Sequence, residues 1–115
     1  MKKIQNLETA LLTFEQAALN HSEATEQGDY KVCNKSYSTI IKAVAYLREQ
    51  NHLQELLPFL NNSSEGVRVI AAANLLPING KEAIATLEDI AQGIGIQSFN
   101  AKMVLREWRK GTLKL

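Results

Sequence analysis

Apolar residues recur three and four positions apart through most of this 115-residue chain, a spacing typical of amphipathic α-helices. Ala, Leu, Glu, Gln and Lys dominate the long segments, and these residues lose little free energy on entering a helix. Proline occurs only at Pro58 and Pro77, and the one hairpin-type dipeptide, Asn79-Gly80, lies between helical patterns. The sequence therefore predicts an all-α fold.

Six helical segments are expected, and short turns separate them. Their expected bounds are 7–27, 30–50, 53–60, 65–76, 81–92 and 98–110. Gly28 should end the first helix and Asp29 should cap the second, while Ser98 should cap the last and Gly111 should end it. Short turns make consecutive helices antiparallel neighbours, so we expect three hairpins in a single domain over 1–115.

The buried face of each segment follows from the same spacing. We expect the larger apolar residues to point into the core. The expected set includes Leu7, Leu11, Leu12, Phe14, Leu19, Val32, Cys33, Tyr37, Ile40, Ile41, Val44, Leu47, Val67, Ile70, Leu75, Ile84, Leu87, Ile90, Phe99, Val104 and Leu105.

The composition limits the classes of protein to which this chain can belong. Hydrophobic residues make up 45% and charged residues 22%, which is typical of a soluble globular domain. Thirteen Lys and Arg stand against twelve Asp and Glu, so the net charge of +1 creates no general attraction for nucleic acid or anionic membranes. Cys33 is the only cysteine, and no run approaches the roughly 18 apolar residues of a membrane span. The polar residues after Lys2-Lys3 leave no clean signal-peptide core, so cytoplasmic residence is expected.

Residues that could carry chemistry are few, and none has the partners that chemistry needs. His21 and His52 lack metal-ligand spacing, and Cys33 lacks an activating base. Gly93-Ile94-Gly95 lacks the Gly-Lys-Ser/Thr ending of a phosphate loop, and the adjacent acids Glu88-Asp89 point about 100° apart on a helix. We therefore expect a protein that is not an enzyme and holds no cofactor or metal.

A basic cluster near the C-terminus has two interpretations. Lys102, Arg106 and Arg109 fall on one helical face, and Lys110 and Lys114 follow. Cations near a helix C-terminus interact favourably with the helix dipole, which alone could explain the last of them. Alternatively, the cluster binds an acidic partner or nucleic acid.

The middle of the chain resembles a known repeat. Leu56-Leu57-Pro58-Phe59-Leu60, followed by Val67-Arg68, Ala71-Ala72 and Leu75, resembles one HEAT repeat. HEAT repeats usually carry an aspartate in the turn, which pairs with the arginine, whereas this turn offers Asn62. We expect Arg68 to bond the turn carbonyls or Asn62.

The chain as a whole resembles a family of small bacterial HEAT-like proteins of uncharacterised function. The segment 83–108 resembles a degenerate second copy of the repeat, and the ending with Trp108 and Gly111 is part of the likeness. Trp108 should be a core residue or a cap over the end of the stack. Some members of this type resemble immunity proteins encoded beside contact-dependent or other polymorphic toxins.

The resemblance implies a HEAT-like α-solenoid fragment and a protein partner, such as a cognate toxin domain. It also implies that the second helix of each hairpin lines a concave face. The side chains expected to bind the partner there are Lys35, Lys42, Tyr46, Asn74, Lys102, Arg106 and Arg109. The alternatives are a general adaptor in a larger complex and, less favoured, a nucleic-acid binder that uses the basic cluster. We expect a monomer or weak dimer without membrane association.

Overall fold

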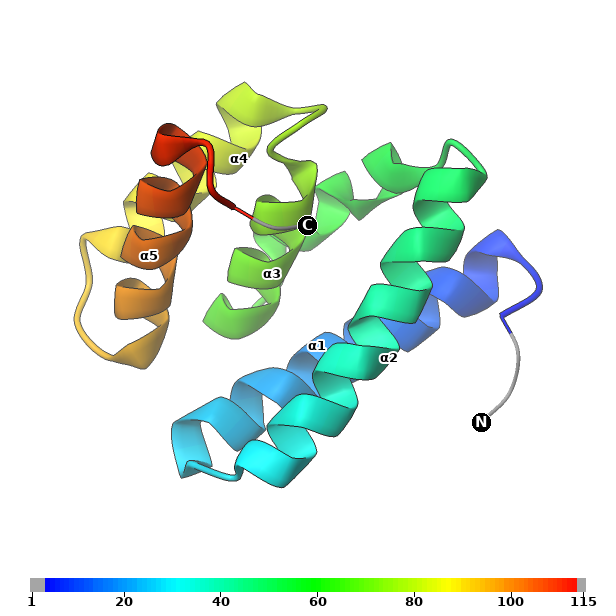
Figure 1. Ribbon diagram of the computed structural model, residues 1–115, viewed down its shortest axis with the longest axis horizontal. Helices are drawn as coiled ribbons and strands as arrows, with labels where there is room; N and C mark the ends of the chain where they lie inside the picture. The colour runs from blue at the N-terminus through cyan, green and yellow to red at the C-terminus, as the bar shows by residue number, and fades with distance from the viewer. Residues whose placement is uncertain (1–3, 114–115) are drawn as a thin grey trace.

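The computed structural model describes residues 4–113, and this part of the chain is all-α, as the sequence predicted. It contains five α-helices and one 3₁₀-helix (Figure 1). Their bounds are α1 Leu7–Gln27, α2 Tyr30–Glu49, η1 Leu53–Asn61, α3 Glu65–Leu75, α4 Gly80–Ala91 and α5 Ile96–Lys110. The largest difference from the predicted bounds is two residues, at the start of α5.

Most helix ends form where the sequence predicts them. Gly28 ends α1 with a φ of 74° and Gly111 ends α5 with a φ of 75°, a region that favours glycine. The side chain of Asp29 accepts a hydrogen bond from the Val32 backbone N–H and so caps α2. These local signals therefore set the helix lengths.

The predicted cap of α5 is wrong. The helix begins at Ile96 because Gly95 adopts a φ of 110°, where the chain reverses before the helix starts. Ser98 instead lies inside the first turn of α5 and is buried, and its Oγ has no hydrogen-bond partner among the described residues. A glycine with a positive φ, and not the predicted serine, thus precedes the first residue of this helix.

Helix α1 connects the two halves of the molecule. It packs along α2 on one side and against α3 and η1 on the other, while α3 also packs on α4 and α5 (Figure 1). Phe14 of α1 is fully buried, and its ring centroid lies 5.3 Å from that of Phe59 in η1. One continuous core thus extends from α1 to α5.

The middle pair of helices differs from the other two because its first member, η1, is a 3₁₀-helix. Pro58 lies inside η1, and proline has no backbone N–H to donate to an α-helical hydrogen bond. Leu53 and Leu56 are nevertheless buried, so this segment supplies core residues as its apolar character suggests.

Several large residues that we expected in the core lie at the surface. Leu12 is 61% exposed, Phe99 59%, Tyr37 53% and Ile41 50%, and Val32 is exposed as well. On α1 the buried face consists largely of alanines, whose small side chains let neighbouring helices approach closely. Leu12 lies two residues from both Ala10 and Phe14, so it points away from that face.

Within residues 4–113, no helix is both long enough and apolar enough to cross a membrane.

Candidate protein-binding groove

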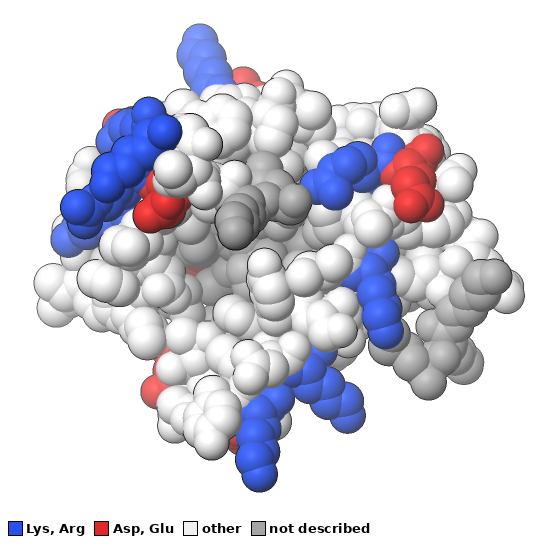
Figure 2. All heavy atoms as spheres, viewed as in Figure 1, with Lys and Arg blue, Asp and Glu red and all other residues white. Residues whose placement is uncertain are grey.

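A groove of about 420 Å³ lies between α2, α3 and α5, and His21 of α1 also lines it. On the face that Figure 2 views, Lys and Arg atoms lie along α2 and at the end of α5. The described residues that line the groove are His21, Tyr37, Ile40, Ile41, Val44, Ala45, Arg48, Val69, Ile70, Ala73, Asn74, Val104 and Leu113. Most of them are apolar, so the groove is suited to apolar side chains.

Helix α2 supplies one wall of the groove because its apolar residues cover more than one face. Leu47 and Ala43 are buried against the rest of the molecule. Tyr37 and Ile41 lie on the next face of the helix, line the groove and remain half exposed. Packing within the described chain therefore leaves part of the apolar surface of α2 uncovered.

Few polar side chains line the groove, and His21 and Arg48 differ in their charge at pH 7. Burial lowers the pKa of His21 below its usual value of 6.5, so this ring is neutral at pH 7. Its centroid lies 6.1 Å from that of the Tyr37 ring. Arg48 is therefore the only charged side chain among the described residues that line the groove at this pH.

Of the seven side chains predicted to bind a partner, Asn74 is the one that lines this groove. Its Nδ2 donates to the Ile70 carbonyl at 2.9 Å. On α5 the groove is reached by Val104, whereas Lys102 and Arg106 lie two residues to either side of it. Residues two apart on a helix point about 200° apart, so these cations face away from the groove.

Lys102, Arg106 and Arg109 line a different surface, together with residues of α4. Arg109 forms a 3.1 Å ion pair with Glu88, so one charge of the predicted basic cluster is already balanced. Lys110 lies on the same surface, and Lys114 falls outside the described residues.

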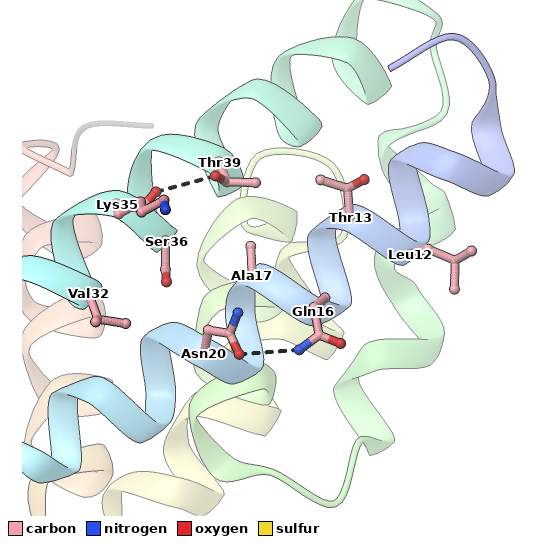
Figure 3. A pocket seen from close by; sticks show the side chains of 9 residues that line it. All are labelled: Leu12, Thr13, Gln16, Ala17, Asn20, Val32, Lys35, Ser36 and Thr39. Carbon is pink, nitrogen blue, oxygen red and sulfur yellow. Dashed lines mark hydrogen bonds between the residues drawn. The ribbon is translucent and has the colours of Figure 1, made fainter. Parts of the chain in front are cut away.

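Lys35 lies on a third surface, a depression of about 610 Å³ between α1 and α2. Figure 3 shows Gln16 and Asn20 of α1 joined by a hydrogen bond there, with Val32 and Ser36 of α2 also lining the depression.

The other two predicted residues of α2 also differ in their surroundings. Lys42 is exposed, and Tyr46 is partly buried against the core. The seven predicted side chains therefore do not share one concave face. The reason is that the groove presents the apolar residues of α2 and α5, while most polar residues of these helices point elsewhere.

Sequence reasoning assigned the main groove residues, Tyr37 and Ile41, to the core. One signal in the sequence could have distinguished these two residues from the core residues of α2. The apolar positions of α2 extend over an arc that is wider than contact with α1 alone requires, which indicates a second apolar surface.

Three other residues considered in the sequence analysis, Cys33, Arg68 and Trp108, contact other parts of the protein. The Cys33 Sγ lies 3.0 Å from the Thr25 Oγ1 and is partly buried. Arg68 Nη1 donates to the Asn62 carbonyl at 2.6 Å, which confirms its predicted role in the turn. Trp108 is partly buried against the core. Within residues 4–113, no three His, Cys, Asp or Glu side chains are grouped so that they could hold a metal ion.

No family model matches this chain, and neither the curated proteins nor the solved structures contain a significant match. The groove is accordingly the feature on which a functional proposal can be based.

Proposed function

We propose that this protein is a non-enzymatic binding module that holds a protein partner in the groove between α2 and α3. The observation that supports the proposal is the half-exposed pair Tyr37 and Ile41 above a buried apolar floor. Contiguous apolar surface of this kind on a soluble domain is typical of an interaction site. A large aromatic or aliphatic side chain at the centre of such a surface contributes strongly when a partner covers it.

The more specific proposal is that the protein is a bacterial immunity protein, which inactivates a cognate toxin by binding it. It rests on the resemblance of the sequence to small HEAT-like proteins. The physical properties of the fold suit such a role, because a rigid helical surface loses little conformational entropy when it binds. Inhibition by occlusion also requires no catalytic group in the inhibitor.

A general adaptor would use the same groove but would differ in its binding behaviour. An immunity protein binds one partner tightly and abolishes its activity, whereas an adaptor binds several partners more weakly. Nucleic-acid binding is less well supported, because the basic surface of α5 contains the Arg109–Glu88 ion pair and lies away from the apolar groove.

The test is quantitative affinity capture from nuclease-treated extracts of the cells that naturally make the protein. Wild type is compared with Ile41→Asp, which places a charge in the groove, and with Ile94→Asp as the matched control. Ile94 is 98% exposed in the loop before α5 and lies outside the groove. We expect one stoichiometric protein partner, which Ile41→Asp loses by at least about tenfold and Ile94→Asp retains.

Circular dichroism and thermal melting must first show that both variants are folded. A partner that binds all three proteins equally would refute the groove as the binding site. The immunity proposal requires in addition that the partner is toxic when expressed alone and harmless when co-expressed with this protein. A harmless partner would favour the adaptor.

A further inference from the structure

The groove has the length of a short helix. Along α2 it extends from Tyr37 to Arg48, and the lining residues recur at Tyr37, Ile41, Val44 and Arg48. Eleven steps of about 1.5 Å give a groove of roughly 16 Å, or three helical turns. A partner helix presents side chains at the same three- and four-residue spacing, so its apolar face could follow this wall.

The opposite wall is also shaped to receive side chains. Val69, Ile70 and Ala73 of α3 line it, and the small side chain of Ala73 leaves space between α3 and α2. Val104 of α5 also lines the groove. The two walls therefore offer apolar contacts on both sides of an inserted row of side chains.

Charge is unevenly distributed between the first two helices. Helix α1 contains four glutamates and no lysine or arginine, which gives it a net charge of −4. Helix α2 contains Lys31, Lys35, Lys42 and Arg48 against Glu49 alone, which gives it a net charge of +3. Of the four cations of α2, Arg48 alone is among the described residues that line the groove, whereas Lys35 lies on the depression between α1 and α2.

Arg48 places a positive charge beside the apolar residues of the groove. It is the charged residue that lines the apolar surface, and its side chain forms no ion pair with the described residues. An arginine in this position is available to a carboxylate of a partner, and a guanidinium can bind a carboxylate through two parallel hydrogen bonds.

We infer that the groove binds an acidic amphipathic helix of the protein partner. The apolar face of that helix inserts beside Tyr37 and Ile41, and an acidic residue of the helix pairs with Arg48. This inference rests on the proposed function and specifies the chemistry of its partner. A basic residue at that position of the helix is disfavoured, because its charge would approach the like charge of Arg48.

The test is a displayed library of helical peptides of about 16 residues. Leucine is held at positions spaced for one apolar face, and the remaining positions vary among Glu, Lys, Gln and Ala. The library is selected on wild-type protein, and peptides that also bind Ile41→Asp are removed. We expect the selected peptides to contain a clear excess of Glu over Lys.

The affinities of individual selected peptides then test each contact by fluorescence anisotropy. We expect Ile41→Asp to weaken binding at least about tenfold and Arg48→Gln to weaken it about three- to tenfold, whereas Ile94→Asp leaves it unchanged. The Arg48→Gln effect should shrink as salt is raised, because added ions screen an exposed charge pair.

Three outcomes would overturn the inference. The first is a selected pool rich in Lys, and the second is a set of affinities indifferent to Ile41→Asp. The third is concentration-dependent self-association that Ile41→Asp abolishes, which would assign the groove to a second copy of this chain. If natural partner capture still requires Ile41 while the peptides are not acidic, the inference fails and the proposed function stands. If natural capture is indifferent to Ile41→Asp, the groove-based function itself fails.

Discussion

Single residues decide how closely α1 and α3 can approach each other. Gly66 near the start of α3 faces Ser22 of α1, and a Cβ at position 66 would lie 2.0 Å from the Ser22 Oγ and 2.4 Å from its Cβ. Gln97 of α5 points its Nε2 at the Ser22 Oγ from 3.5 Å, and both side chains are buried. Three helices therefore meet at a point that has no space for one further methyl group.

Gly66→Ala is expected to lower the free energy of unfolding by about 1–3 kcal/mol, because the added methyl group must displace the Ser22 side chain in a packed interior. The matched control is Gly80→Ala at the start of α4, where a Cβ would meet nothing within 4 Å. Alanine there should be neutral or stabilise by up to about 1 kcal/mol, because it restricts the unfolded chain. Urea unfolding of both variants measures the difference, and equal effects would contradict the close approach at Gly66.

At the scale of elements, the turn between η1 and α3 is held by several side chains. The Asn62 Oδ1 accepts from the Ser64 backbone N–H at 2.9 Å, and its Nδ2 donates to Glu15 of α1 at 3.0 Å. Arg68 donates back to the Asn62 carbonyl. Asn62 thus connects the turn to α1, a role that a neutral amide fulfils with both a donor and an acceptor.

Ser64 begins α3 as its cap, and its Oγ accepts from the Val67 backbone N–H at 3.3 Å. Ser64→Ala is expected to destabilise the protein by about 1 kcal/mol, because that N–H loses its partner at the helix end. Ser63→Ala is the control, since Ser63 is exposed in the same turn. Thermal melts of the two variants should differ, and equal melting temperatures would show that the cap contributes nothing.

At the scale of the whole molecule, the continuous core predicts a single folding unit. The radius of gyration is 13.2 Å, as expected for one compact domain of this length. Phe14 lies in the core near one end of the chain. Trp108 is the only tryptophan and lies in α5, near the other end of the chain. The fluorescence of Trp108 can therefore detect whether a destabilising substitution at Phe14 also lowers the stability of α5.

Phe14→Leu is expected to cost roughly 1–2 kcal/mol, less than the 3–5 kcal/mol typical of phenylalanine to alanine, because leucine refills part of the space. In a cooperative domain, the urea midpoint must shift equally in Trp108 fluorescence and in far-ultraviolet circular dichroism. A fluorescence midpoint that stays at the wild-type value would instead show that α1 and α2 unfold separately from α3 to α5.

The positions of the helices follow from local signals in the amino-acid sequence. Caps such as Asp29 and Ser64 and terminators such as Gly28 and Gly111 act within a few residues, so their effects follow from local chemistry. The failure at Ser98 is also local in origin, because two signals competed and the backbone conformation of Gly95 prevailed.

Which apolar residues are buried and which form the groove depends on how the helices pack against one another. Ile41 and Leu47 both fit the helical pattern of α2, yet Leu47 is fully buried and Ile41 is half exposed. Periodicity places residues on a helix face, but it contains no information about which neighbouring helix covers that face. The close contact of α1 with α3, and the space left between α2 and α3, arise from packing among segments distant in sequence. For that reason the polar residues chosen from the sequence lie on separate surfaces, and the apolar groove emerged only from the three-dimensional arrangement.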